Sequence, residues 1–320
     1  MSKLKKNIIT YIVITAVIYL GLSLYADFNL VLKTLEKFNW ILLPALFSLS
    51  LMNYFFRFLK WDYYLNLLDL PLDKLDSFGI FMSGLVMSLT PGKFGEFIKA
   101  YFTNQIAGYK MSKTIPIIFA ERITDFISLL FLALIGVYIY GYGEVIMLGT
   151  SVFFLAIIFV ITQKKIALYI IDLLSRIKFL EKHLSKIHDA YESSYKMLLP
   201  KPLIKMIFLS LIAWFFECFG FYLILSNFSN QISIFWSTFV YAFSIIVGAI
   251  TMLPAGVGIT EGSLTFMLIE KGLTKDIAVV STFIIRMVTL WFAILVGIIS
   301  LMLFQKRYGK KVSINLNQGE

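Results

Sequence analysis

The sequence has little charge, two histidines and one cysteine. Charged residues make up 15% of the 320 residues, whereas hydrophobic residues make up 59%. A soluble domain of this size could not bury so much apolar surface in one core, so the composition excludes a soluble globular protein. A single cysteine, Cys218, excludes an intrachain disulfide and a cysteine-based metal cluster. His183 and His188 are five residues apart, off a shared helical face, so we expect no metal site and no cofactor.

Acidic residues are scarcer than basic ones, 19 against 29, which gives a net charge of +10. The basic residues fall between apolar stretches instead of forming a soluble basic domain, so we expect no nucleic-acid partner. The sequence also has no nucleotide-binding P-loop of the form GxxxxGK(S/T). Gly92-Lys93 has no glycine five residues before it and no serine or threonine after it. Any energy source is therefore expected to be a gradient, a partner or downhill movement of a lipid.

Long apolar runs define the fold class. A membrane-spanning helix needs about 20 apolar residues, and six stretches meet this length: 7–25, 40–58, 115–140, 144–162, 203–226 and 277–304. No small-residue cleavage site follows the first stretch, so we expect it to be retained. Two further apolar regions are interrupted by proline and glycine: 77–107 by Pro91, Gly92 and Gly95, and 234–270 by Pro254, Gly256, Gly258 and Gly262.

The sequence thus predicts an all-α polytopic membrane protein with about six full spans and two broken, re-entrant helical hairpins. If the broken regions cross the membrane instead, the number of spans is eight. Basic residues, including Arg57, Lys60 and Lys99, gather on one predicted side, which places both termini in the cytoplasm of a cell-membrane protein. The predicted divisions are a membrane half at 1–162, an amphipathic cytoplasmic linker at 163–202, a second membrane half at 203–305 and a tail at 306–320.

An internal repeat relates the two halves. The first half contains Pro91, Gly95, Glu96, Gly108 and Arg122, and the second contains Pro254, Gly258, Glu261, Gly272 and Arg286. The proline-to-glycine step is four residues in both, and the later glycine-to-arginine step is fourteen in both. Because the first hairpin is expected to enter from the cytoplasm and the second from outside, the repeat is predicted to be inverted, as in many secondary transporters.

Charged residues within the predicted spans are the candidate site residues. Glu121 and Asp125 share a helical face at i and i+4, whereas Arg122 points elsewhere. Since a charge at the centre of a membrane helix costs about 2.5 to 3.5 kcal/mol, such residues should be paired and face protein or water. We expect Glu217 to pair with Arg286. For the arginines a structural ion pair and ligand contact stay open, and Arg57 is either a phosphate ligand or an interfacial anchor.

Three motifs carry a resemblance: SLTPGKFGE at 88–96, ERITD at 121–125 and LPAGVGITE at 253–261. In combination they resemble the lysylphosphatidylglycerol synthase transmembrane-region family, also described as flippase-like, over nearly the whole chain. In some members this domain is fused to a soluble aminoacyl-transferase domain, which we do not expect in this protein. The resemblance therefore implies a stand-alone flippase-like membrane domain and argues against aminoacyl transfer.

The predicted function is movement of a phosphate-bearing lipid, anionic or polyprenyl-phosphate, between leaflets. A membrane-embedded transferase acting on lipid-linked substrates, or an accessory subunit with a membrane-enzyme partner, is the alternative. No catalytic set of residues stands out, so we do not expect an enzyme. The candidate lipid or headgroup-binding residues are Arg57, Pro91, Gly92, Gly95, Glu96, Glu121, Arg122, Asp125, Glu217, Pro254, Gly256, Gly258, Glu261 and Arg286.

Overall fold

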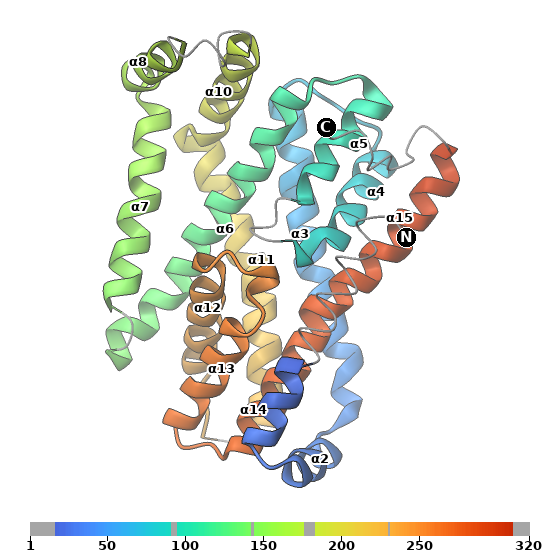
Figure 1. Cartoon of the computed structure of the whole chain (residues 1–320), viewed down its shortest axis with the longest axis vertical. Helices are drawn as coiled ribbons and strands as arrows, with labels where there is room; N and C mark the ends of the chain where they lie inside the picture. Colours follow the sequence, from blue (N-terminus) through green and yellow to red (C-terminus); the bar gives the residue numbers. More distant parts are fainter. Residues whose placement is uncertain (1–16, 91–94, 142–143, 176–182, 230, 310–320) are drawn as a thin grey trace.

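The computed structural model describes residues 17–309, apart from 91–94, 142–143, 176–182 and 230 (Figure 1). These residues form helices and turns, with no strand among them. Five helices are long and apolar enough to cross a membrane: Trp40–Leu67, Met111–Ile139, Glu144–Thr162, Pro200–Ser226 and Lys275–Tyr308. They confirm five of the six predicted spans and the all-α polytopic fold. The sixth, 7–25, lies mostly outside the described residues, although 17–25 are helical.

The first half of the chain follows the predicted order of spans and break. Its elements are α2 (Phe28–Lys37), η1 (Trp40–Leu42), α3 (Leu43–Leu67), α4 (Lys74–Gly84), η2 (Leu85–Leu89), α5 (Ile98–Ala107), α6 (Met111–Tyr140) and α7 (Glu144–Thr162). Carboxylates start two of the shorter helices, because Asp27 and Asp73 accept hydrogen bonds from the first free backbone N–H groups of α2 and α4. α7 remains largely uncovered by the rest of the chain, as a lipid-facing helix requires.

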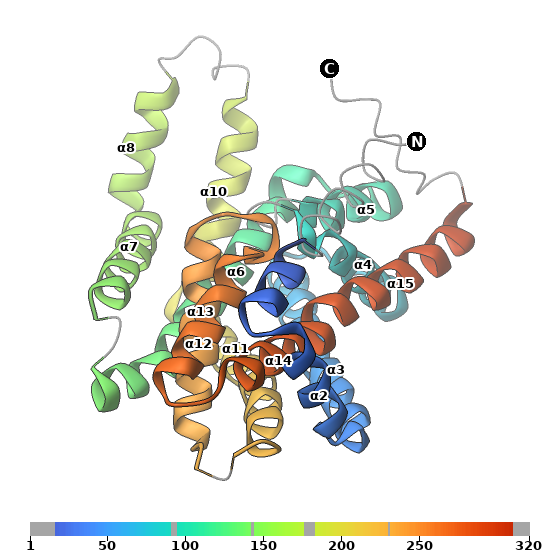
Figure 2. The ribbon, with the colours of Figure 1, turned by 60° about the horizontal axis from the view of Figure 1, so that its bottom comes forward.

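Residues 163–202 contain α8 (Lys164–Ser175) and α10 (Leu184–Leu198), with 176–182 between them outside the described residues. α10 packs against α6 and α7, and Figure 2 shows both linker helices at one side of the molecule, next to α7. The second half follows as α11 (Pro200–Ser226), α12 (Ile234–Ile250), η4 (Pro254–Gly256), α13 (Ile259–Glu270), α14 (Lys275–Arg286), the π-helical segment η5 (Met287–Trp291) and α15 (Phe292–Tyr308).

Both proline-glycine regions are broken helices, as predicted. α4 contacts α5 and α12 contacts α13, so each region forms a hairpin, and none of these four arms reaches the length of the spanning helices. Figure 1 shows the α4–α5 hairpin in the upper half of the molecule and the α12–α13 hairpin in the lower half. The two breaks meet, because η2 contacts η4. Pro91 and Gly92 themselves lie outside the described residues.

The second break has a backbone that few residues other than glycine adopt easily. Met252 and Ala255 have φ of 52°, Gly256 has φ of 65° and Gly258 has φ of 89°. Gly256 also lies against another segment, since a Cβ built on it would be 2.6 Å from the Thr260 hydroxyl and 3.2 Å from the Gly248 backbone. The glycines of the second motif are therefore needed for both the left-handed conformation and the close approach of α12 and η4.

Gly297 allows α15 to approach the first break. A Cβ on Gly297 would lie 2.3 Å from the backbone nitrogen of Val86 in η2, and a backbone atom cannot move aside cheaply. We expect Gly297→Ala to reduce the stability of the purified protein by about 1 to 3 kcal/mol, the usual cost of overpacking, measured as a lower melting temperature in detergent. Gly262→Ala, where a Cβ meets nothing within 4 Å, is the matched control. Equal melting temperatures for the two variants would contradict this packing.

Candidate functional site

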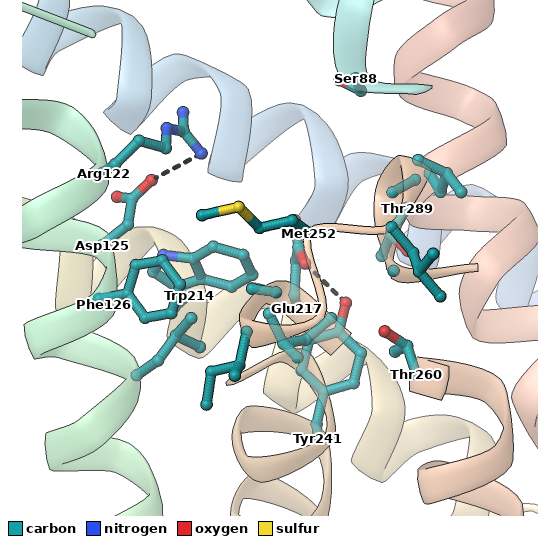
Figure 3. A pocket seen from close by; sticks show the side chains of 18 of the residues that line it. Ser88, Arg122, Asp125, Phe126, Trp214, Glu217, Tyr241, Met252, Thr260 and Thr289 are labelled. Carbon is teal, nitrogen blue, oxygen red and sulfur yellow. Dashed lines mark hydrogen bonds and ion pairs between the residues drawn. The ribbon is translucent and has the colours of Figure 1, made fainter. Parts of the chain in front are cut away.

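A cavity of about 540 Å³ lies between the two halves of the chain, where the hairpin breaks meet (Figure 3). Its wall is mainly apolar and aromatic, and includes Phe126, Phe153 and Trp214. Ser88 and Thr90 contribute from the first break, and Ala255 and Gly256 from the second. Its charged lining residues are Arg57, Arg122, Asp125, Glu217 and Arg286. A mostly apolar pocket with a few convergent charges is the common form of a site for an amphipathic ligand.

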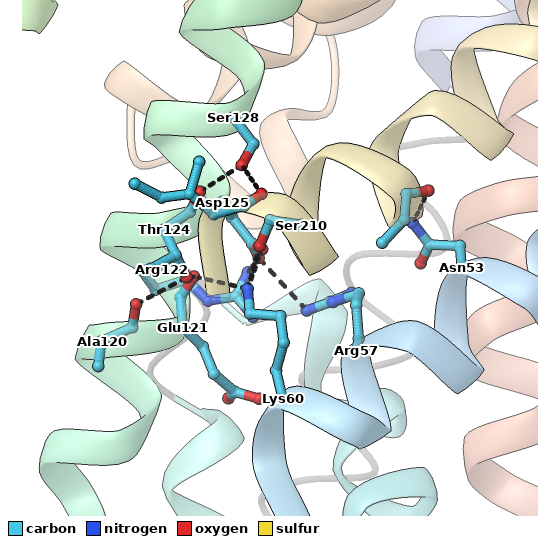
Figure 4. Close-up of polar contacts among 12 residues, drawn as sticks. Asn53, Arg57, Lys60, Ala120, Glu121, Arg122, Thr124, Asp125, Ser128 and Ser210 are labelled. Atoms are coloured by element: carbon cyan, nitrogen blue, oxygen red, sulfur yellow. Dashed lines mark hydrogen bonds and ion pairs between the residues drawn. The ribbon is translucent and has the colours of Figure 1, made fainter. Parts of the chain in front are cut away.

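Asp125 is the centre of a buried ionic network at one side of this cavity (Figure 4). Its Oδ1 accepts from the Lys60 Nζ at 2.7 Å and from the Ser210 hydroxyl at 2.9 Å. Its Oδ2 lies 3.4 Å from Arg122 Nη1 and 3.9 Å from Arg57 Nη2. Cations from α3 and a hydroxyl from α11 thus converge on one carboxylate of α6, which compensates for its removal from water.

Lys99 links the first hairpin to the same helix. Its Nζ lies 2.6 Å from Glu121 and 3.4 Å from Glu96, and 4.9 Å from the centre of the Trp61 ring. Lys60 also reaches the backbone carbonyl of Glu121 at 3.5 Å. The expectation that Arg122 points away from Asp125 is wrong, because its Nη1 lies 3.4 Å from the Asp125 carboxylate.

The placement of Lys60 and Lys99 corrects a prediction. Both were counted among the basic residues of cytoplasmic segments, yet each is only 1% exposed and lies within the ionic network. Acidic partners on α6 make this burial possible, and those partners are 22 and 65 residues away along the chain. Two of the basic residues that suggested orientation are therefore structural, and the sequence signal that could have identified them is the three-residue spacing of Glu96 and Lys99.

The two halves use the same kind of pair at their breaks. In the first, Arg122 Nη2 donates to Glu96 at 3.1 Å across 26 residues of sequence. In the second, Arg286 Nε donates to Glu261 at 2.7 Å across 25 residues. In each repeat the glutamate therefore binds the arginine of the same repeat. A buried carboxylate and guanidinium in contact form a charge-assisted hydrogen bond, stronger than a neutral one.

Arg286 also fixes the second break. Its Nη2 donates to the Ala255 carbonyl at 2.8 Å, and Glu261 accepts from the Gly258 N–H at 2.7 Å. The expected pair of Glu217 and Arg286 is wrong, because Arg286 forms its ion pair with Glu261. Glu217 instead accepts from the Tyr241 hydroxyl at 2.7 Å (Figure 3). Glu261 lies in the first turn of α13, directly after the η4 turn. Because Arg286 donates to the Ala255 carbonyl of that turn, its guanidinium lies beside Glu261.

The cavity brings together six of the predicted residues: Arg57, Arg122, Asp125, Glu217, Gly256 and Arg286. Glu96, Glu121 and Glu261 lie behind the lining as partners of cations, whereas Gly95, Pro254 and Gly258 belong to the breaks. Pro91 and Gly92 are outside the described residues. The sequence missed Tyr54, Trp214 and Tyr241, which line the cavity from α3, α11 and α12. Nothing local distinguishes them from the other aromatic residues of a membrane protein.

Comparison with known proteins assigns the chain to a family. A family model described as the lysylphosphatidylglycerol synthase TM region matches residues 8–297. A UPF0104 membrane protein from Pyrococcus horikoshii is 28% identical over 246 residues, which cover 68% of this chain and 73% of that protein. One from Methanothermobacter thermautotrophicus is 22% identical and covers 79% and 82%. One from Methanocaldococcus jannaschii is 21% identical and covers 97% and 99%. With its multi-pass helical fold, the chain belongs to the family of lysylphosphatidylglycerol synthase TM regions.

Proposed function

We propose that this protein moves a phosphate-bearing lipid, or a lipid-linked headgroup, between the leaflets of a membrane. The cavity between the two hairpin breaks carries this proposal, because three arginines reach it while most of its wall is apolar. Guanidinium groups suit phosphate, and an apolar wall suits the acyl or prenyl chain that accompanies it.

Arg57 is the lining arginine with the weakest protein contact. Arg286 has two hydrogen bonds and Arg122 has one, whereas Arg57 makes no hydrogen bond to the described residues and lies 3.9 Å from Asp125. Arg57 therefore has donors available for a phosphate, while the other two arginines mainly hold the breaks. This favours the ligand role of Arg57 over that of an interfacial anchor.

The route between leaflets is part of the proposal. The two hairpins would form an inverted repeat, and movement of one against the other would open the cavity to each leaflet in turn. The contact of η2 with η4, and the equivalent glutamate–arginine pairs of the two halves, support this relation. We place the protein in the cell membrane with both termini in the cytoplasm, and its partner would be the lipid, anionic or polyprenyl phosphate.

The alternative is a membrane-embedded transferase, or an accessory subunit of one. An enzyme of this kind needs a carboxylate or metal set free to act on the substrate. Among the described residues, Glu96, Glu121 and Asp125 are each bound to lysine or arginine, and no group of three candidate metal ligands is found there. These contacts favour lipid movement over covalent chemistry.

Reconstitution tests the proposal directly. We expect liposomes containing the purified protein to expose an inner-leaflet, headgroup-labelled phosphatidylglycerol or polyprenyl phosphate to an outside quencher faster than protein-free liposomes. The labelled lipid should be recovered chemically unchanged by mass spectrometry. Failure of every phosphate lipid to move, with a correctly folded protein, would overturn the proposal, and a covalently altered lipid would support the transferase instead.

A further inference from the structure

Three polar atoms at one end of the cavity lack hydrogen bonds. The Trp214 Nε1 and the Arg122 Nε are buried and have no hydrogen-bond partner among the described residues, and the buried Asp125 Oδ2 has only ion contacts, with Arg122 Nη1 at 3.4 Å and Arg57 Nη2 at 3.9 Å. All three residues line the cavity, and Trp214 and Asp125 are 5% and 2% exposed. Because buried donors and acceptors are nearly always satisfied, a group of such atoms on residues that line one cavity points to a place where a ligand or a water molecule binds.

These atoms belong to neighbouring faces of two packed helices. On α11, Ser210, Trp214 and Glu217 recur at i, i+4 and i+7, and so share one face. Ser210 donates to Asp125 at 2.9 Å, which places that face of α11 against α6. Figure 3 shows the nitrogen of the Trp214 ring on the side facing Asp125 and Arg122.

The unsatisfied set contains two donors and one acceptor, which restricts the group that can bind. A phosphate accepts from both donors, but when fully ionised it has no proton to donate to Asp125 Oδ2. An ammonium donates to Asp125, but it leaves the tryptophan and arginine N–H groups unmet. A hydroxyl both donates and accepts, so a hydroxylated group satisfies all three atoms.

The surroundings also fit a neutral ring or polyol. Asp125 already contacts Lys60, Arg122 and Arg57, so its charge is compensated and gives little preference for a further cation. Phe126 and Phe154 stack with ring centres 4.6 Å apart beside Trp214 in the cavity wall. Aromatic faces of this kind can pack on the C–H groups of a sugar or cyclitol while its hydroxyls reach polar partners.

We propose that the cavity has a hydroxyl-binding subsite, formed by Trp214, Asp125 and Arg122, for the headgroup of a phosphodiester lipid that carries a neutral polyol or sugar. This rests on the proposed function and names its substrate class. Arg57 contacts the phosphate, and the subsite contacts the hydroxyls beyond it. The three polar atoms are buried, so binding of the headgroup requires that they become accessible from the cavity.

The test compares lipids that differ only beyond the phosphate. Binding to the purified full-length protein in detergent is measured for short-chain phosphatidylinositol, phosphatidic acid and phosphatidylcholine. We expect the inositol lipid to bind about tenfold more tightly than the other two, the size expected for one hydrogen bond with a buried group. Trp214→Phe should remove this preference, measured as the ratio of inositol-lipid to phosphatidic acid affinity, and Trp236→Phe, a buried tryptophan outside the cavity lining, should keep it.

Equal binding of the three lipids by the native protein would overturn the subsite, and this outcome does not depend on whether Trp214→Phe folds. The subsite would also be overturned if Trp214→Phe has the native melting temperature and still prefers the inositol lipid. Competition by soluble inositol 1-phosphate as strong as that by the lipid would keep the hydroxyl subsite but assign it to a free phosphate ester. A binding preference without movement in liposomes would overturn the proposed translocation and leave the subsite intact.

Discussion

Glu261→Gln is expected to destabilise the protein by about 3 to 5 kcal/mol. Glu261 is fully buried and lies 2.7 Å from Arg286, so the substitution leaves a guanidinium in the protein interior without its anion. It also weakens the bond from Gly258 that begins α13. Thermal unfolding in detergent, together with titration by sodium dodecyl sulfate, measures the loss.

The double variant Glu261→Gln/Arg286→Gln separates the charge from the packing. Removing both partners should restore part of the stability lost in Glu261→Gln, because no uncompensated charge is left buried. Lys110→Gln is the surface control, since its pair with Asp189 at 3.5 Å has an exposed lysine and should contribute less than about 1 kcal/mol. A double variant as unstable as the sum of the single ones would show that the pair is not coupled.

Arg57→Gln should have the largest effect on ligand binding while leaving the fold intact. Arg57 lines the cavity without a hydrogen bond to the described residues, so the variant removes little that stabilises the protein. A hydrogen bond to a charged group contributes about 1.5 to 3 kcal/mol. Affinity for a phosphate lipid should therefore fall about 10-fold to 150-fold. Lipid binding by the purified protein and movement in liposomes both measure this effect.

Arg57→Lys tests whether the planar guanidinium is needed or only a positive charge. It should retain part of the affinity, because a lysine keeps the charge but cannot bind phosphate with two parallel hydrogen bonds. Arg307→Gln, on the surface beside Asp76 at 3.4 Å, is the matched control and should bind as the native protein does. If Arg57→Gln binds phosphate lipids with native affinity, Arg57 is not their anchor.

The positions of the two broken hairpins could be predicted from the sequence, but the ion pairs within them could not. Proline and glycine act on their own backbone, so the breaks near residues 90 and 254 could be located without knowledge of any neighbour. The repeated spacing also identified Glu96 with Arg122, and Glu261 with Arg286, as equivalent residues. It did not identify them as pairs, and the expected partner of Arg286 was Glu217, because both choices satisfy the need to neutralise a charge.

The sequence by itself determined the membrane class, five spanning helices, both breaks and the charged residues that had to be paired, because hydrophobicity and backbone preference are local properties. Only the tertiary structure decided which charges meet. Lys60 and Ser210 reach Asp125 across 65 and 85 residues of sequence. Trp214 lines the same cavity as Asp125 because α11 packs against α6. Such pairings depend on how α3, α6 and α11 pack together. The cavity exists only where they converge with both breaks.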